Sequence, residues 1–136
     1  PQAARPWQHV LDCLCGYFTF ARGLTEGAAV PAALNFGPAS DAPAITVAEL
    51  AEAVQAALGG AGWKPANDPG PLEMMALSID STKARECLGW RDRLAGDLCV
   101  SWLSDWYRAL NAGADMREKT LAQIEVFETL HPGTTA

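Results

Sequence analysis

Apolar residues recur at steps of three and four through most of this chain, and this spacing restricts its fold more than any other feature. Such spacing is typical of helices that bury one face. Glycines close the periodic segments, as they commonly do at helix ends. The pattern therefore predicts four to five helices. The periodic segments are 10–24, 47–58, 84–88, 96–111 and 121–130.

Capping residues place several of the helix ends. Thr46 and Glu49 form a capping box, in which the hydroxyl bonds an N3 amide and the glutamate reaches back. Asp115 offers a cap for the last helix, and Asp80 or Ser81 one for the short helix. Gly89 is well placed as the residue after the short helix. We expect the apolar residues of every segment, Cys87 of the short helix and the stripe 10–24 included, to face the core.

Only two or three short segments suit strands. Residues 33–37 and 74–79 are predicted to be strands, and residues 5–10 a strand or a tight turn. These segments are too few and too far apart for an independent doubly wound sheet. We therefore predict a helix-rich α+β fold with one domain over 1–136. A long loop over 59–71 and a flexible tail over 131–136 complete it.

Composition and charge exclude several classes of protein. Apolar residues make up 49% of the chain and charged residues 19%, which excludes intrinsic disorder. The net charge is −6 and no run of Lys or Arg occurs, so neither nucleic acid nor an anionic membrane is an expected partner. No apolar stretch reaches the ~18 residues of a membrane span. We expect a cytoplasmic protein.

Motifs for metal binding and catalysis are missing from the sequence. The four cysteines include a C-x-C pair at Cys13 and Cys15 but no zinc-type spacing, and we interpret them as buried, reduced side chains. His9 is interpreted as a structural histidine. No strand leads into a G-x-G-x-x-G turn, and no tyrosine precedes a lysine by four. We therefore predict no catalytic residue, no metal and no cofactor for this chain.

An arginine and two tryptophans are the main candidates for ligand binding among the residues themselves. The guanidinium of Arg5 would suit a diphosphate, although a solvated arginine is the commoner case. Trp7 would stack on a base, with packing as its alternative, and Trp63 is treated in the same way. Trp90, Trp102 and Trp106 are assigned to the core. Met74 and Met75 begin the predicted strand at 74–79, where strand packing is a commoner role for them than a ligand cradle.

Several phrases, in order, resemble one family. They include Arg5-Pro-Trp-Gln-His-Val-Leu-Asp12, Leu34-Asn-Phe-Gly-Pro38, Leu88-Gly-Trp-Arg91 and Asp115-Met-Arg117 followed by Thr120-Leu-Ala-Gln-Ile124. This series resembles the C-terminal third of CDP-glucose 4,6-dehydratases, which are extended short-chain dehydrogenase/reductases. The resemblance covers nearly the whole chain. Leu72-Glu73 stands where the family tends to have His-Glu, and Cys13 and Cys15 replace an expected Pro and Ser.

The resemblance implies an NAD-dependent conversion of CDP-glucose to CDP-4-keto-6-deoxyglucose and water, in deoxysugar and surface polysaccharide (O-antigen) synthesis. In such enzymes NAD and the Tyr/Lys pair lie on an N-terminal Rossmann half, which is absent here. Arg5 matches the arginine that contacts the substrate diphosphate. Residues 73–77 match the strand at the nucleotide end, so the expected substrate-binding residues are Arg5, Trp7, Glu73 and Met75.

Three interpretations follow. The chain is a C-terminal portion of such a dehydratase, inactive alone, with weak or no affinity for CDP-glucose or CDP. It is otherwise a small helical interaction module without a catalytic role, or a proteolysed enzyme. The expected protein partners are the missing Rossmann half and a second copy of the chain through self-association.

Overall fold

Five helices and two short strands make up the described part of the chain, which covers residues 1–65 and 74–130 of a computed structural model. This confirms the predicted helix-rich α+β fold. The predicted tail at 131–136 and part of the loop at 59–71 lie outside the described residues. The helices are α1 (Val10–Thr25), α2 (Val47–Leu58), α3 (Thr82–Leu88), α4 (Asp97–Asn111) and α5 (Met116–Thr129).

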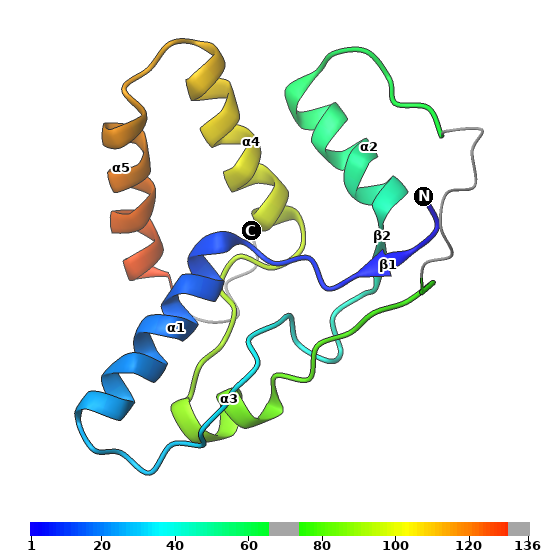
Figure 1. The fold of residues 1–136 in the computed structure, drawn as a ribbon. Coiled ribbons are helices and arrows are strands. Elements are labelled where there is room, and N and C mark those ends of the chain that lie inside the picture. The colour runs from blue at the N-terminus through cyan, green and yellow to red at the C-terminus, as the bar shows by residue number, and fades with distance from the viewer. Residues whose placement is uncertain (66–73, 131–136) are drawn as a thin grey trace.

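The two strands form one small antiparallel sheet. β1 (Ala4–Arg5) pairs with β2 (Ile45–Thr46), with Ala4 opposite Thr46 and Arg5 opposite Ile45. A single parallel bridge joins Ala4 to Ala76 on the other side of β1. The segment 74–79 was predicted to be a strand, and this bridge is all that it forms. The sheet lies between α2 and the segment at 76 (Figure 1).

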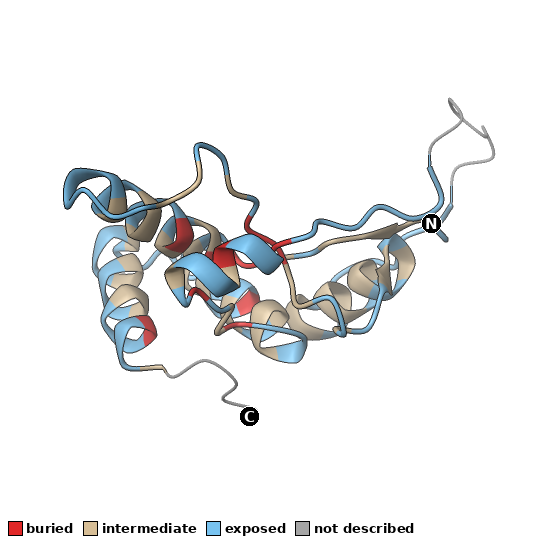
Figure 2. Cartoon of the chain, turned by 90° about the horizontal axis from the view of Figure 1, so that it is seen from below, coloured by how far each residue is buried: buried red, intermediate tan, exposed pale blue. Residues whose placement is uncertain are grey.

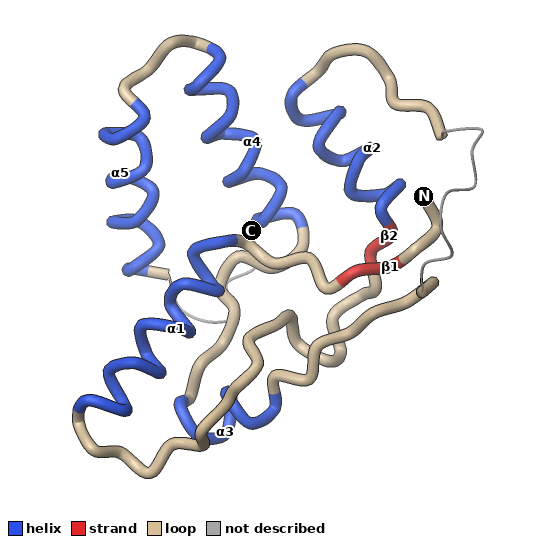
Figure 3. Tube along the Cα trace, in the orientation of Figure 1, coloured by secondary structure: helices blue, strands red, loops and turns tan. Residues whose placement is uncertain are grey.

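Local capping explains where the helices begin and end. Thr46 accepts a hydrogen bond from the amide of Glu49, whose carboxylate accepts one from the Thr46 amide, so the predicted capping box is confirmed. Asp115 accepts bonds from two amides at the start of α5, as predicted. Gly89 ends α3 at a φ of 64°, a conformation that other residues rarely adopt. Figure 3 shows the loops that join these helices.

The helices pack as a chain of neighbours. α4 lies between α2 and α5, and α1 contacts α3 (Figure 1). The core cluster consists of Phe36, Ala84 and Trp90, with Cys15, Phe20, Leu34 and Leu88 packed around it. The core position predicted for Trp90 is confirmed, since its side chain is 4% exposed. Trp102 and Trp106 are only half-buried. Figure 2 shows how few of the described residues are fully buried.

Two expectations about burial and one about a strand are wrong. The predicted inward stripe of α1 is largely exposed, with Val10 61%, Phe18 72% and Leu24 54% exposed. The predicted strand at 33–37 is a loop, because no backbone within 1–65 and 74–130 pairs with it. Cys87 is exposed rather than buried, since α3 turns its Ala84 side to the core. All three errors concern contacts with distant parts of the structure.

No helix in the described ranges is both long and apolar enough to cross a bilayer.

Candidate functional site

A wide, open groove of about 1200 Å³ lies between the β1 segment, the loop that precedes β2 and the loop that follows α3. Its walls come from four stretches of chain, at 4–8, 38–45, 76–79 and 91–98, together with Asp12 and Arg85. The groove brings together residues that lie far apart in the sequence, from Ala4 to Leu98. It includes two of the four residues predicted to bind a ligand.

Arg5 lines this groove from β1. The side chain is half-buried, and its NH1 group donates hydrogen bonds to the carbonyls of Ala4, at 2.8 Å, and Met74, at 3.0 Å. These bonds tie the guanidinium to two neighbouring extended segments. Arginine has five N–H donors in a planar fork, a geometry that suits carboxylates and phosphates. Arg5 thus lines the groove with a guanidinium whose NH1 group is held by two backbone carbonyls.

Trp7 lines the same groove two residues later. Its indole N–H donates to the carbonyl of Ile45 at 3.0 Å, which fixes the ring against β2. The side chain remains 36% exposed. Trp7 is thus anchored at one edge while part of its surface faces solvent, an arrangement compatible with packing and with stacking on a base.

The other two predicted residues are not part of the groove as described. Met75 is 64% exposed and absent from the groove lining, and its carbonyl accepts a bond from the Ala4 amide. Its role in the structure is to pair its backbone with β1. Glu73 lies outside the described residues. Trp63 is 37% exposed and also stands apart from the groove lining.

His9 has a structural position, in agreement with its interpretation from the sequence. The residue is 6% exposed, and its Nδ1 accepts a hydrogen bond from the Leu11 amide at the start of α1. The imidazole lies edge-on to Trp102, with ring centroids 6.1 Å apart. Burial lowers the pKa of His9 below its usual 6.5, so the neutral form that accepts this bond is favoured.

Asp12 joins α1 to the far wall of the groove. The carboxylate is 1% exposed and accepts hydrogen bonds from the amides of Arg93, at 2.8 Å, and Leu94, at 3.0 Å. Burial raises the pKa of this carboxyl, although the two amide bonds oppose the shift. Sequence reasoning gave Asp12 no role. The available signal was a lone charge among the apolar residues at 10–18.

Arg85 connects three more segments at the groove. Its guanidinium donates to the hydroxyl of Ser81, the carbonyl of Gly37 and the carboxylate of Asp92, the last at 2.6 Å. It also lies over the indole of Trp90, 5.2 Å from the ring centroid. Through these interactions the Arg85 guanidinium holds neighbouring segments of the chain together. Arg93 is similarly held by the Phe127 carbonyl and ring.

The titratable residues that line the groove are of two kinds only. Four are arginines and four are aspartates, and the lining contains no histidine, cysteine, lysine or tyrosine. The guanidinium groups in this lining are donors of the kind that suits anionic ligands. The lining residues with a charge are Arg5, Asp12, Asp41, Arg85, Arg91, Asp92, Arg93 and Asp97.

The described residues do not fit an NAD site. A dinucleotide fold needs a parallel strand, a glycine-rich turn and a helix in sequence, whereas the sheet here is antiparallel and β2 passes directly into α2. Within the described ranges, no group of three or more His, Cys, Asp or Glu is placed to hold a metal ion.

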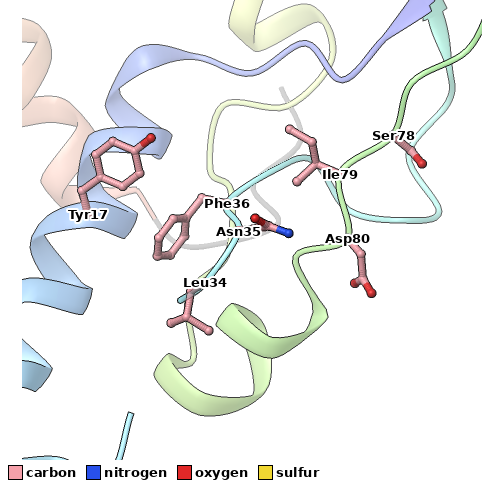
Figure 4. Close-up of a pocket in the computed structure, with 7 residues that line it drawn as sticks. All are labelled: Tyr17, Leu34, Asn35, Phe36, Ser78, Ile79 and Asp80. Carbon is pink, nitrogen blue, oxygen red and sulfur yellow. The ribbon is translucent and has the colours of Figure 1, made fainter. Parts of the chain in front are cut away.

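A second, smaller hollow of about 300 Å³ lies beside α1 (Figure 4). Its lining combines Tyr17 of α1 with the segments 34–36 and 78–80. In Figure 4 the Tyr17 and Phe36 rings lie next to each other on one side, and Asn35 lies between the two loops. This hollow could not be predicted from the sequence, because its walls come from three separate segments.

Comparison with known proteins gives one clear similarity. The chain is 36% identical over 118 residues to the CDP-glucose 4,6-dehydratase of Salmonella typhimurium. The alignment covers 85% of this chain but 33% of that enzyme, so the chain spans about a third of its relative's length. No protein-family model matches the chain. The resemblance indicated by the sequence phrases is thereby confirmed.

Proposed function

We propose, from the similarity to CDP-glucose 4,6-dehydratase, that the chain is the substrate-binding portion of such an enzyme. The reaction would convert CDP-glucose to CDP-4-keto-6-deoxyglucose and water in the cytoplasm, in deoxysugar and surface polysaccharide synthesis. The similarity over 85% of the chain carries this proposal. The groove supports it, because four arginines and the indole of Trp7 lie in its lining.

Arg5 and Trp7 are the proposed contacts with the nucleotide. Both lie in the groove on one short segment, and both are fixed by a hydrogen bond to a neighbouring strand or loop. A guanidinium held in place loses less freedom when it binds a diphosphate, because its orientation is already set. Glu73 and Met75 stay as proposed contacts at the nucleotide end.

The chemistry itself is assigned to the NAD-binding half that such an enzyme requires. NAD would accept and return a hydride there, and the chain alone would be inactive. Titration calorimetry of the chain with CDP, CDP-glucose and cytidine tests the binding role. We expect CDP and CDP-glucose to bind more tightly than cytidine, because only they present a diphosphate to Arg5.

Substitution at Arg5 makes this test specific. Arg5→Gln should weaken CDP binding about tenfold, the effect of losing one charge-assisted contact. Cytidine binding should stay unchanged. Arg22→Gln removes an exposed arginine of α1 outside the groove and is the matched control. Equal CDP affinity in both variants, or no heat with CDP at millimolar ligand, would contradict the proposal.

The alternative is a helical interaction module without a nucleotide role. The exposed apolar residues of α1 favour it, because patches of this kind usually mark contact sites. Light scattering distinguishes the two functions together with calorimetry. A defined dimer of the chain without CDP affinity would favour the module.

A further inference from the structure

Four aspartates line the proposed nucleotide groove, although a nucleotide diphosphate is itself an anion. Like charges repel, so a carboxylate that faces such a ligand weakens its binding. Two of the four carboxylates are bound within the protein instead. Asp12 is 1% exposed and accepts hydrogen bonds from two amides, and the Asp92 side chain is 10% exposed and pairs with Arg85. Both aspartates hold the same short turn, residues 92–94.

The turn 92–94 is bonded to other parts of the groove from two sides. On one side, the Asp12 carboxylate accepts hydrogen bonds from two amides of the turn, at 2.8 and 3.0 Å. On the other side, Arg85 donates to the carboxylate that begins the turn and to the carbonyl of Gly37, which directly precedes the wall at 38–45. The position of the turn therefore depends on both of these contacts.

Asp12 is also joined to the two proposed nucleotide contacts, because Arg5, Trp7 and Asp12 lie on the continuous segment 5–12. Within this segment the Trp7 amide donates to the Arg5 carbonyl at 2.9 Å, and the Asp12 amide donates to the His9 carbonyl at 3.1 Å. These local bonds limit how far the segment bends. The distance between the Arg5 and Trp7 wall and the opposite turn is therefore governed by the Asp12 carboxylate.

We propose that Asp12 is a positioning residue for the nucleotide, whose carboxylate holds the turn 92–94 at a fixed distance from Arg5 and Trp7 and so sets the width of the groove. A groove whose width is fixed before binding loses less freedom when a ligand enters, and its affinity is higher for that reason. The Asp12 carboxylate acts through the turn, because it is buried and bonded to the turn's amides. This inference rests on the proposed function.

Titration calorimetry of Asp12→Asn with CDP tests the proposal. The asparagine has nearly the same size, but its oxygen replaces only one of the two acceptors and its NH2 group faces the other amide. We expect CDP to bind Asp12→Asn about fivefold more weakly than wild type, or weaker still, since coupling between two sites typically begins at about this value. The titrations are made under conditions in which urea unfolding shows every variant to be folded.

Asp41→Asn is the charge-matched control. It removes the same negative charge from the same groove lining, but at an exposed position. Electrostatic repulsion alone predicts that both substitutions strengthen CDP binding. Positioning predicts opposite signs, with tighter binding of CDP to Asp41→Asn and weaker binding to Asp12→Asn. Equal or tighter binding of CDP to Asp12→Asn, compared with wild type, would overturn the proposal.

Gly16→Ala separates positioning from a loss of stability. Gly16 lies on the same helix as Asp12 but outside the groove lining, and a Cβ atom there would overlap the Phe36 ring, so this variant is also destabilised. The folded variant should bind CDP as tightly as wild type. If its CDP affinity falls as much as that of Asp12→Asn, destabilisation explains both losses and the positioning role is wrong.

Hydrogen exchange in the wild-type chain gives a second readout. Coupling between two sites is reciprocal, so if the Asp12 contacts strengthen CDP binding, bound CDP must strengthen those contacts. We expect CDP to slow exchange of the Arg93 and Leu94 amides about fivefold relative to the Lys119 amide, which donates within α5. Equal slowing of all three amides would contradict the positioning role.

The same titrations distinguish this inference from the proposed function. A wild-type chain that binds no CDP would refute the proposed function, and the positioning role with it. A wild-type chain that binds CDP, with an affinity that Asp12→Asn retains in full, would refute the positioning role alone.

Discussion

Replacing Asp12 with alanine should destabilise the chain more than any other exchange of a single acidic residue in the groove. The variant leaves the Arg93 and Leu94 amides without the carboxylate that now accepts from them at 2.8 and 3.0 Å. An unsatisfied buried amide costs about 1–3 kcal/mol, so the two together should cost about 2–6 kcal/mol. Domains have total stabilities of about 5–15 kcal/mol, so this loss is large.

Urea unfolding followed by tryptophan fluorescence measures the effect. With a slope of about 2 kcal/mol per molar urea, the midpoint of Asp12→Ala should fall by about 1–3 M. The indole of Trp90, which donates to the Asp12 carbonyl at 3.1 Å, reports on this region of the structure. The free energy of unfolding of Asp12→Asn should fall less, because the amide oxygen still accepts one of the two bonds.

Asp41→Ala is the matched control for this experiment. Asp41 lines the same groove but is exposed, and exposed substitutions usually change stability by less than about 0.5 kcal/mol. If Asp12→Ala lowers the free energy of unfolding by less than about 1 kcal/mol, the two amide bonds do not hold the 93–94 turn to α1. The structural role assigned to the carboxylate would then be wrong.

Three further predictions concern local features. Burial lowers the pKa of His9, so protonation favours the unfolded state, and the stability of the chain should fall as the pH drops below 6.5. The variant His9→Asn should flatten this part of the pH–stability profile relative to wild type. Gly16→Ala should cost about 1–3 kcal/mol in urea unfolding, because a Cβ atom there would overlap the Phe36 ring; a neutral result would show that the ring moves freely. Thr46→Ala should cost about 1 kcal/mol by loss of the α2 cap, and Thr46→Ser should retain most of that stability.

Local features of the fold could be predicted from the sequence because neighbouring residues determine them. The capping box at Thr46, the cap at Asp115 and the glycine at 89 depend on side chains and backbone within a few positions. The periodic segments likewise gave the helices nearly at their observed bounds. Helical spacing, however, shows only that a face is apolar. It does not show what covers that face, which is why the stripe at 10–24 was assigned to the core.

Distant contacts limited the prediction of the site. The sequence singled out Arg5 and Trp7, which do share the groove, through their place in one recognisable phrase. It could not show that Asp12 bonds the amides of Arg93 and Leu94, about eighty positions later in the chain. The strand predicted at 33–37 failed for a related reason, because a strand exists only where a second backbone lies beside it.

The exposed apolar residues of α1 have a consequence for the abundance of this protein in a cell. An uncovered apolar helix face of this kind is what chaperones and proteases recognise on incompletely assembled chains, and small changes in unfolded or unassembled fraction alter abundance several-fold. The amount of the chain in a cell would then depend on how far this face is covered, and not on its rate of synthesis alone.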